Sequence, residues 1–248
     1  MKGLSGFVLK WIAMITMVVD HVGLHFMNNM RMMRFIGRIS LPIYAWFVAE
    51  SVHATQMRHT EVSHAVRLFL LAVVSEIPYD LFFSGAYYIP GKGNVVFTIF
   101  IGYLVCVLMN RTKAVPLKLL ILLAGCWVAE YFHFSYRFIG VLLIVAFDLL
   151  QTHSRKTGKK QPVLLFLILF LYVLYYVIHN ARPQTLPGIV SGFLRHNWSQ
   201  TGALISGLFL LFYNGKRGPV TKWFTWLFRL FYPLHLIVLL VMEKYLFL

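Results

Sequence analysis

Charged residues are scarce in this chain of 248 residues. They make up 12% of the sequence, whereas apolar residues make up 59%. A soluble domain carries about 25% charged residues, so this composition argues against an ordinary soluble enzyme. We therefore expect an integral membrane protein in which residues 1–248 form a single membrane domain.

Acidic residues are the scarcer charge, since the chain has 8 Asp and Glu against 23 Lys and Arg, for a net charge of +15. A strongly basic chain can bind nucleic acid. Here the basic residues fall in short clusters between apolar runs, which is typical of cytoplasmic loops that face anionic lipid. The expected partner is therefore the lipid bilayer and not nucleic acid, although a basic rim would also attract a phosphorylated substrate.

Cysteines are few, and the common catalytic motifs are missing. Cys106 and Cys126 lie inside apolar runs and are expected to be small core residues rather than a disulfide or a metal site. The sequence has no P-loop, no GxGxxG, no zinc-binding histidine pair and no nucleophile elbow. Phosphoanhydride hydrolysis, dinucleotide redox chemistry and serine hydrolysis are unsupported, and no metal is expected.

Long apolar runs are abundant. A membrane-spanning helix needs about 20 apolar residues, and this length predicts an all-α, polytopic bundle of about nine spans. The predicted spans are 6–26, 39–56, 64–83, 95–110, 116–132, 138–150, 162–179, 201–213 and 222–245. The sixth and eighth are short, so each is either a thin-membrane span or a re-entrant element. The first is expected to be retained rather than cleaved as a signal peptide.

Basic clusters set the expected orientation. Cytoplasmic loops are enriched in lysine and arginine, and the segments 111–118, 151–161 and 214–222 are rich in both. All three fall on one side if nine spans alternate, which predicts an N-terminus in the cytoplasm and a C-terminus outside. The segment 27–38 falls on the other side although it contains three arginines. Either the span count is wrong near the start of the chain or these arginines point into the helix bundle, and we favour the second explanation.

An acid and an imidazole stand side by side inside the first apolar run. Ionisable groups at membrane depth are costly and therefore rare, and Asp20 with His21 is suited to handling a proton. His21 follows Lys10 by three helical turns, so both share one helix face about 16 Å apart. This spacing suits a substrate with a phosphorylated head and a long thin arm. The alternative is a snorkelling lysine beside a structural histidine.

Two arginines, Arg34 and Arg38, are four residues apart and share one face if the segment is helical. Such a pair can bind phosphate or carboxylate, or it can anchor the chain at the membrane interface. Adjacent helical residues point about 100° apart. Asp20 therefore need not bond His21 and could pair with one of these arginines instead.

A second pair of charged residues, Glu76 and Asp80, also has helical spacing. Two buried carboxylates repel each other unless arginines meet them, and Arg34, Arg38 and Arg67 are candidate partners. A structural ion-pair network is slightly favoured over direct acid–base chemistry at this place.

The remaining candidates lie near the ends of spans. Asn94 and Thr98 are one turn apart and could cap a helix or line a cavity. Tyr232 and His235 flank a proline that would free backbone carbonyls in the last span, and the histidine is equally suited to a structural or a functional role. Lys216 and Arg217 follow Asn214-Gly215, a turn suited to capturing phosphate at the cytoplasmic surface.

These segments together resemble the TraX family of membrane proteins, which is named for the conjugative pilin N-acetylase. The matching segments run in order through nearly the whole chain: 4–7, 19–23, 34–39 with Pro42, 75–80, 94–98, 213–216 and 231–235. More loosely, Lys10 with His21 is similar to the basic residue and histidine in the first span of acyltransferase family three, where the basic residue is usually arginine.

The resemblance implies transfer of an acetyl group from cytoplasmic acetyl-CoA to a hydroxyl or amine of a glycan, a lipid or a protein. His21 would be the general base, and Asp20 would hold or stabilise its imidazole. Arg34 and Arg38 would orient Asp20 or polarise the thioester oxygen. The expected CoA-binding residues are Lys10, Asn214, Lys216 and Arg217. The alternatives are a proton-coupled transporter and a non-catalytic scaffold for a surface protein.

Overall fold

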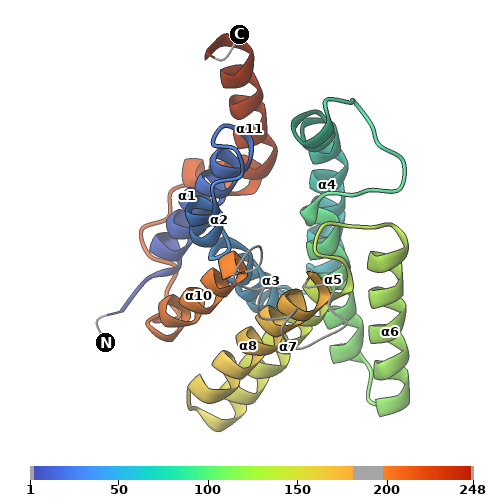
Figure 1. The fold of residues 1–248 in the computed structure, drawn as a ribbon. Helices are drawn as coiled ribbons and strands as arrows, with labels where there is room; N and C mark the ends of the chain where they lie inside the picture. The colour runs from blue at the N-terminus through green and yellow to red at the C-terminus, as the bar shows by residue number, and fades with distance from the viewer. Residues whose placement is uncertain (1–2, 181–197, 247–248) are drawn as a thin grey trace. The chain divides into compact units, whose positions relative to one another are not determined.

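The structure, a computed structural model, describes residues 3–180 and 198–246, and these are mainly helical (Figure 1). The helices are α1 (Gly6–His25), α2 (Arg31–Gly37), α3 (Ser40–Gln56), α4 (Glu61–Ser84), α5 (Val95–Arg111), α6 (Val115–Tyr131), α7 (Arg137–Thr157), α8 (Pro162–Asn180), the 3-10 helix η2 (Trp198–Thr201), α10 (Gly202–Leu211) and α11 (Lys222–Leu246). Strand-like pairing in the described part is limited to two single bridges. The predicted all-α class is confirmed.

Local signals mark several helix ends. Ser5 precedes α1, and its side chain accepts a hydrogen bond from the Val8 N–H. Asn94 does the same for α5 by accepting from the Val96 N–H. Both satisfy a backbone donor that has no partner inside the helix. Gly85 ends α4 with a left-handed φ of 69°, a conformation that favours glycine.

Each predicted span coincides with a described helix. Four helices are long and apolar enough to cross a membrane: α1, α7, α8 and α11. The apolar stretches Val95–Arg111 and Trp198–Leu211 are shorter. Together with the apolar composition, these helices make the chain a membrane protein.

One predicted boundary needs correction. The sixth span, predicted as 138–150, extends through α7 to Thr157 and is 21 residues long. Its final turns are polar but stay helical, with the Thr157 hydroxyl donating to the His153 carbonyl. The segment 27–38 connects two spans as expected, and it contains the short helix α2.

The chain divides into two compact units. The first comprises Met1–Tyr44 and Gly158–Phe228, and the second comprises Ala45–Thr157 and Arg229–Leu248. Two of the three boundaries fall within α3 and α11, and the third falls between α7 and α8. A single membrane domain stays a prediction.

In the first unit, α1 packs against α2, η2 packs against α2, and α10 packs against α8 and η2. Glycines allow the closest approaches. A Cβ on Gly23 of α1 would overlap Met33 of α2, and a Cβ on Gly202 would overlap the Phe35 carbonyl. Small residues at such crossings let helix backbones approach closely in membrane proteins.

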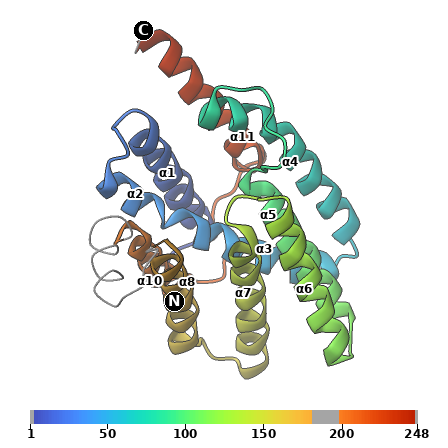
Figure 2. The same cartoon turned by 45° about the vertical axis from the view of Figure 1, so that its right-hand side comes forward.

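In the second unit, α5 is the central helix and packs against α4, α6 and α7. Figure 2 shows α5, α6 and α7 side by side from a second direction. Gly102 of α5 faces the Ile144 side chain of α7, and Gly125 of α6 faces Val105 of α5. These contacts position the polar start of α5, where several predicted site residues lie.

Candidate functional site

Asp20 of α1 forms an ion pair with Arg34 of α2. Nη1 of Arg34 lies 2.8 Å from Oδ2 of Asp20, and the aspartate is only 7% exposed. The predicted pairing of Asp20 with an arginine from segment 27–38 is confirmed. The other carboxylate oxygen, Oδ1, is buried and has no hydrogen-bond partner among the described residues. One oxygen of Asp20 is thus held by arginine, and the other is available to a proton donor.

A glycine brings α2 onto the carboxylate. Gly37, the last residue of α2, lies so close to Asp20 that a Cβ at this position would overlap the carboxylate. Arg38 follows directly, and its backbone N–H caps the helix at the Arg34 carbonyl. The charges of both Arg34 and Arg38 act on Asp20. The two arginines that we predicted as a pair therefore both belong to this site.

The third arginine of the segment does not belong to it. Arg31 lies in the first turn of α2 and is exposed. The expectation that all three arginines point inward is therefore wrong for this one. Arg31 shares a helix face with Arg34 and Arg38, three and seven positions later. It stands at the very start of α2, about one turn before the residue that meets Asp20, and is therefore beyond the buried part of the helix.

His21 is also buried, at 8% exposure, and lies deep on α1. Because α1 is helical from Gly6 to His25, the predicted common face of Lys10 and His21 is confirmed, with about 16 Å between them along the axis. Lys10 itself is partly buried, and its Nζ lies 4.4 Å from the centre of the Phe228 ring. This cation–π contact places the ammonium of α1 against a ring near the start of α11.

A basic turn packs against the start of α1. Asn214 forms two hydrogen bonds to the residues before α1. Its backbone N–H donates to the Leu4 carbonyl, and its side-chain amide donates to the Gly3 carbonyl at 3.1 Å. The Gly6 N–H donates to the Lys216 carbonyl at 2.8 Å, and the Phe7 N–H donates to the Arg217 carbonyl at 2.9 Å.

The same turn exposes its basic side chains. Asn214 Oδ1 accepts from the Lys216 N–H at 2.9 Å, and Gly215 adopts a left-handed φ of 73°, as the predicted turn requires. The side chains of Lys216 and Arg217 are exposed. The turn therefore places two cations at the end of α1 where Lys10 lies.

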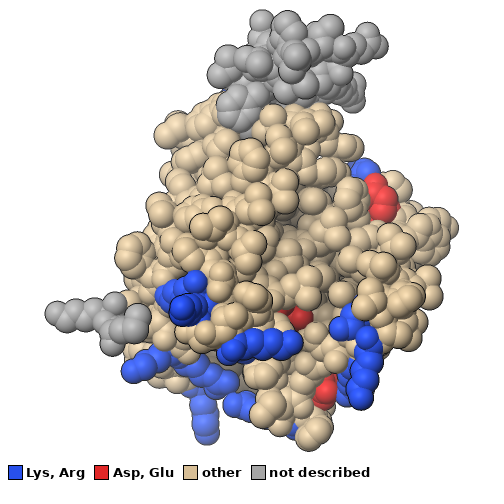
Figure 3. Space-filling view, turned by 90° about the horizontal axis from the view of Figure 1, so that it is seen from below, with Lys and Arg blue, Asp and Glu red and all other residues tan. Residues whose placement is uncertain are grey.

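Lys160 is a further cation of the first unit, which the sequence marked as part of the basic segment 151–161 and not as a site residue. Its ammonium donates to the carbonyls of Leu211 and Tyr213, just before the basic turn. It thereby satisfies backbone acceptors at the end of α10, which a lysine at a helix C-terminus commonly does. More generally, basic side chains clearly outnumber acidic ones on the face drawn in Figure 3.

The second unit holds a polar cluster built on Glu76 and Asn94. The Asn94 N–H donates to Glu76 Oε2 at 3.1 Å, and the Asn94 amide donates to the same oxygen. The amide also donates to the Ala72 carbonyl at 2.8 Å. Asn94 is fully buried and caps α5 as well. The capping residue Asn94 thus supplies hydrogen bonds to the carboxylate of Glu76. Both residues have a structural role here.

The hydrogen bonds that Asp80 and Glu76 receive come from amide groups. Asp80 Oδ2 accepts from the Ile89 N–H at 2.8 Å, whereas Arg67 donates to the Ser63 carbonyl of its own helix. The prediction that Arg67 meets these acids is therefore wrong. The reason is that Arg67 lies more than two turns before Glu76 on α4, out of reach of its carboxylate.

The remaining predicted residues of the second unit lie near this cluster. Thr98 donates to the Ser135 carbonyl, and the Ser135 hydroxyl is 2.9 Å from the Tyr79 hydroxyl. Tyr232 reaches the Val95 backbone. His235 Nδ1 lies 2.8 Å from the Phe231 carbonyl one turn earlier, an arrangement that supports the structural reading of this histidine.

The structure also reveals polar contacts that sequence reasoning missed. Asp148 of α7 is buried and accepts from the Asn110 amide at 3.1 Å, and Gln151 donates to the Trp46 carbonyl at 3.0 Å. Arg111 and Glu61 form an ion pair of 2.7 Å. The position of Asp148 inside the sixth apolar run, where an acid is costly, was the signal that could have revealed it. None of these contacts groups three metal-ligating side chains in the described part of the chain.

The predicted site residues therefore form two sets. Those in the first unit are Lys10, Asp20, His21, Arg34, Arg38, Asn214, Lys216 and Arg217, and those in the second are Glu76, Asp80, Asn94, Thr98, Tyr232 and His235. The first set combines a buried imidazole, a paired carboxylate and exposed cations along one helix. The contacts of the second set are those of a helix-capping and packing network.

Comparison with known proteins finds relatives along the whole chain. The family described as TraX protein matches residues 5–243. A probable fimbrial assembly protein FimC, serogroup H1, of Dichelobacter nodosus is 26% identical over 246 residues, covering 95% of this chain and 94% of the relative. The uncharacterized protein RP591 of Rickettsia prowazekii (strain Madrid E) is 44% identical over 39 residues, 16% of each chain. No solved structure matches the chain.

Proposed function

The chain belongs to the TraX family, and from that premise we propose that it transfers an acetyl group from acetyl-CoA to a hydroxyl or amine acceptor. The arrangement along α1 carries the proposal. Exposed cations, Lys216 and Arg217, lie at the start of the helix. A buried imidazole, His21, lies near its end, beside the carboxylate of Asp20.

This spacing suits CoA. The phosphates would bind Lys10, Lys216 and Arg217, because guanidinium and ammonium groups are strong donors to phosphate oxygens. Asn214 supports this binding indirectly by holding the basic turn against α1. The thin pantetheine arm would then run about 16 Å along α1 and present its thioester to His21.

His21 acts as the general base. It accepts the proton of the acceptor O–H or N–H as the acceptor lone pair attacks the thioester carbonyl carbon. The tetrahedral intermediate collapses when the C–S bond breaks, and the imidazolium returns the proton to the departing thiolate. Water must be excluded from this step, and the burial of His21 supports that requirement.

Asp20 and the arginines set the charge around the imidazole. Arg34 holds Oδ2 of Asp20 at 2.8 Å, which fixes the orientation of the carboxylate. Its buried Oδ1 accepts no hydrogen bond from the described residues and would stabilise the imidazolium. Arg38 supplies a second positive charge for the developing thioester oxyanion.

The acceptor we propose to test first is a fimbrial subunit, because the Dichelobacter nodosus relative is named as a probable fimbrial assembly protein. Acetyl-CoA would enter from the cytoplasm, with the chain in the bacterial inner membrane and its N-terminus in the cytoplasm. The basic segments of the predicted cytoplasmic loops support this orientation.

The deciding experiment uses the full-length protein in detergent with radiolabelled acetyl-CoA and membranes of the producing bacterium as the acceptor source. We expect label to move to a protein or glycan and acetyl-CoA to raise the apparent unfolding temperature. A protein that neither binds acetyl-CoA nor moves label, yet drives proton uptake in liposomes, would favour the transporter reading instead.

A further inference from the structure

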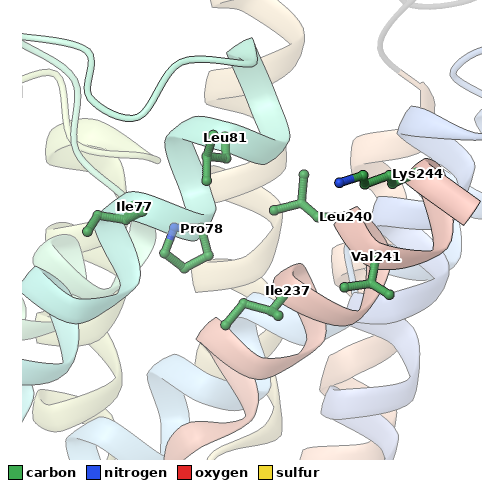
Figure 4. Close-up of a pocket in the computed structure, with 7 residues that line it drawn as sticks. All are labelled: Ile77, Pro78, Leu81, Ile237, Leu240, Val241 and Lys244. Carbon is green, nitrogen blue, oxygen red and sulfur yellow. The ribbon is translucent and has the colours of Figure 1, made fainter.

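A groove lies between α4 and α11 in the second unit, and a lysine stands at its edge (Figure 4). We call this cavity of about 310 Å³ the α4–α11 groove. Its lining residues are Ile77, Pro78, Leu81, Ile237, Leu240, Val241 and Lys244. All but the lysine are apolar. In Figure 4 the Lys244 ammonium points toward the α4 side of the groove rather than away from it.

The walls of the groove suit a hydrocarbon chain. Ile77, Ile237 and Val241 are about half exposed, at 56%, 45% and 50%, and Pro78 on the α4 wall is buried. In a membrane protein such exposed apolar side chains face lipid tails. A hydrocarbon chain that followed the hollow between the two helices would restore van der Waals contact that a void of this size forfeits.

The lysine distinguishes this groove from an ordinary lipid-facing surface. Lys244 is exposed in the last turn of α11, and its Nζ lies 5.9 Å from the centre of the exposed Tyr245 ring. Lysine and tyrosine near a helix end are typical of the membrane interface. No carboxylate in residues 3–180 or 198–246 forms an ion pair with Lys244, so the cation is available to an external anion.

We propose that the α4–α11 groove binds one phospholipid with a net negative headgroup. Its acyl chain lies along Leu81 and Leu240, and its phosphate meets the ammonium of Lys244. A zwitterionic phospholipid would fill the same hollow, but its own cationic group would weaken the attraction to Lys244. The site is independent of the acetyl-transfer chemistry, since all of its residues belong to the second unit.

The test places the full-length protein in nanodiscs that contain photoreactive phosphatidylglycerol or photoreactive phosphatidylcholine, each with a diazirine on one acyl chain. After irradiation, peptide mass spectrometry locates the adducts. We expect phosphatidylglycerol adducts on the lining residues of α4 and α11 to exceed phosphatidylcholine adducts about fivefold, the ratio expected for one lysine near the headgroups.

Two variants and a control separate the parts of the proposal. Lys244→Gln should abolish the preference and leave phosphatidylcholine adducts unchanged, whereas Lys92→Gln, which removes an exposed charge elsewhere in the unit, should retain it. Leu81→Trp should fill the hollow and reduce adducts of both lipids. Equal labelling by the two lipids in the wild-type protein, or adducts that avoid both helices, would overturn the proposal.

Discussion

Asp20 and Arg34 form an ion pair across two helices, at 2.8 Å, in which the side chains are only 10% and 17% exposed. The partners are fourteen residues apart in the sequence and are brought together by the packing of α2 against α1. Removing one partner of a buried pair leaves the other charge uncompensated. The pair therefore ties the stability of this unit to the site around His21.

Breaking this pair is the first test. Arg34→Gln should lower the free energy of unfolding by about 2 kcal/mol, below the range of about 3–5 kcal/mol for fully buried pairs, because Arg34 is partly exposed and Arg38 also acts on Asp20. Asp20→Asn with Arg34→Gln should lose less than the sum of the single losses. The measurement is denaturant unfolding in detergent.

Arg31→Gln is the matched control, since Arg31 lies on the same helix and is exposed. It should change the free energy of unfolding very little. Additive losses from Asp20→Asn and Arg34→Gln would mean that the ion pair contributes nothing measurable to stability.

The imidazole of His21 is the second test. His21→Ala should lower turnover of acetyl-CoA about 10²–10⁴-fold, the usual contribution of a general base, while acetyl-CoA still raises the apparent unfolding temperature. His25→Ala removes an exposed imidazole one turn further along α1 and should leave turnover nearly unchanged. If the His21→Ala protein keeps more than about a tenth of wild-type turnover, His21 is not the general base.

Much of the helical framework could be predicted from the sequence, because apolar runs of span length between basic clusters are a strong signal. The start of α5 at Val95 follows from the capping residue Asn94. Helix α2 could not be predicted in this way. It has seven residues, two of which are arginines, Arg31 and Arg34, so it is too short and too charged to be recognised as a span.

The candidate site could be predicted only in part. Arg34 and Arg38 were candidates for Asp20, but the choice between them depends on the close approach at Gly37, which no local pattern reveals. Similarly, Glu76 bonds to Asn94, eighteen residues away. The sequence suggested arginine partners for Glu76 because opposite charge is the only signal of pairing that it contains. In the structure the partner is Asn94, the residue that caps the neighbouring helix α5.

The ion pair between Glu61 and Arg111 predicts a dependence on pH. Glu61 begins α4, and hydrogen bonds from its own backbone N–H and from Arg111 hold its pKa below the ordinary value of 4.5. A depressed carboxyl pKa stabilises the fold above the ordinary pKa, and this stability is lost as pH falls through the lower folded value. Glu61→Gln should therefore lower the apparent unfolding temperature at pH 7.

The difference between wild type and Glu61→Gln should shrink below pH 4.5, as the wild-type carboxyl also becomes protonated. Thermal scans at one fixed rate, in one detergent, measure it. Glu243→Gln supplies a control on the last helix, since it removes a carboxylate other than the one that pairs with Arg111 at 2.7 Å. A difference that stays constant from pH 7 to pH 3 would show that the pair is not what Glu61→Gln disrupts.

The basic turn at the start of α1 gives the last prediction. The Lys216 and Arg217 carbonyls hold the first turn of α1, while their side chains remain exposed. Replacing both with glutamine removes two charges without removing these backbone bonds. If the cations bind CoA phosphates, KM for acetyl-CoA should rise about tenfold, as expected for loss of a charged hydrogen bond. Turnover at saturation should stay nearly unchanged, because the phosphates are distant from the reacting carbon and bind ground and transition states alike.

The control for this change is Lys92→Gln with Lys113→Gln, which removes two exposed charges from the second unit and should leave KM unchanged. Rising salt should raise KM of the wild-type protein more than that of the turn variant, since exposed charges are screened within about 10 Å at 0.1 M. If KM and its salt dependence are the same in the turn variant and the wild type, the turn serves only to hold α1 and to mark the membrane orientation. Acetyl-CoA would then have to bind through other residues, and the proposal that its pantetheine arm lies along α1 would be wrong.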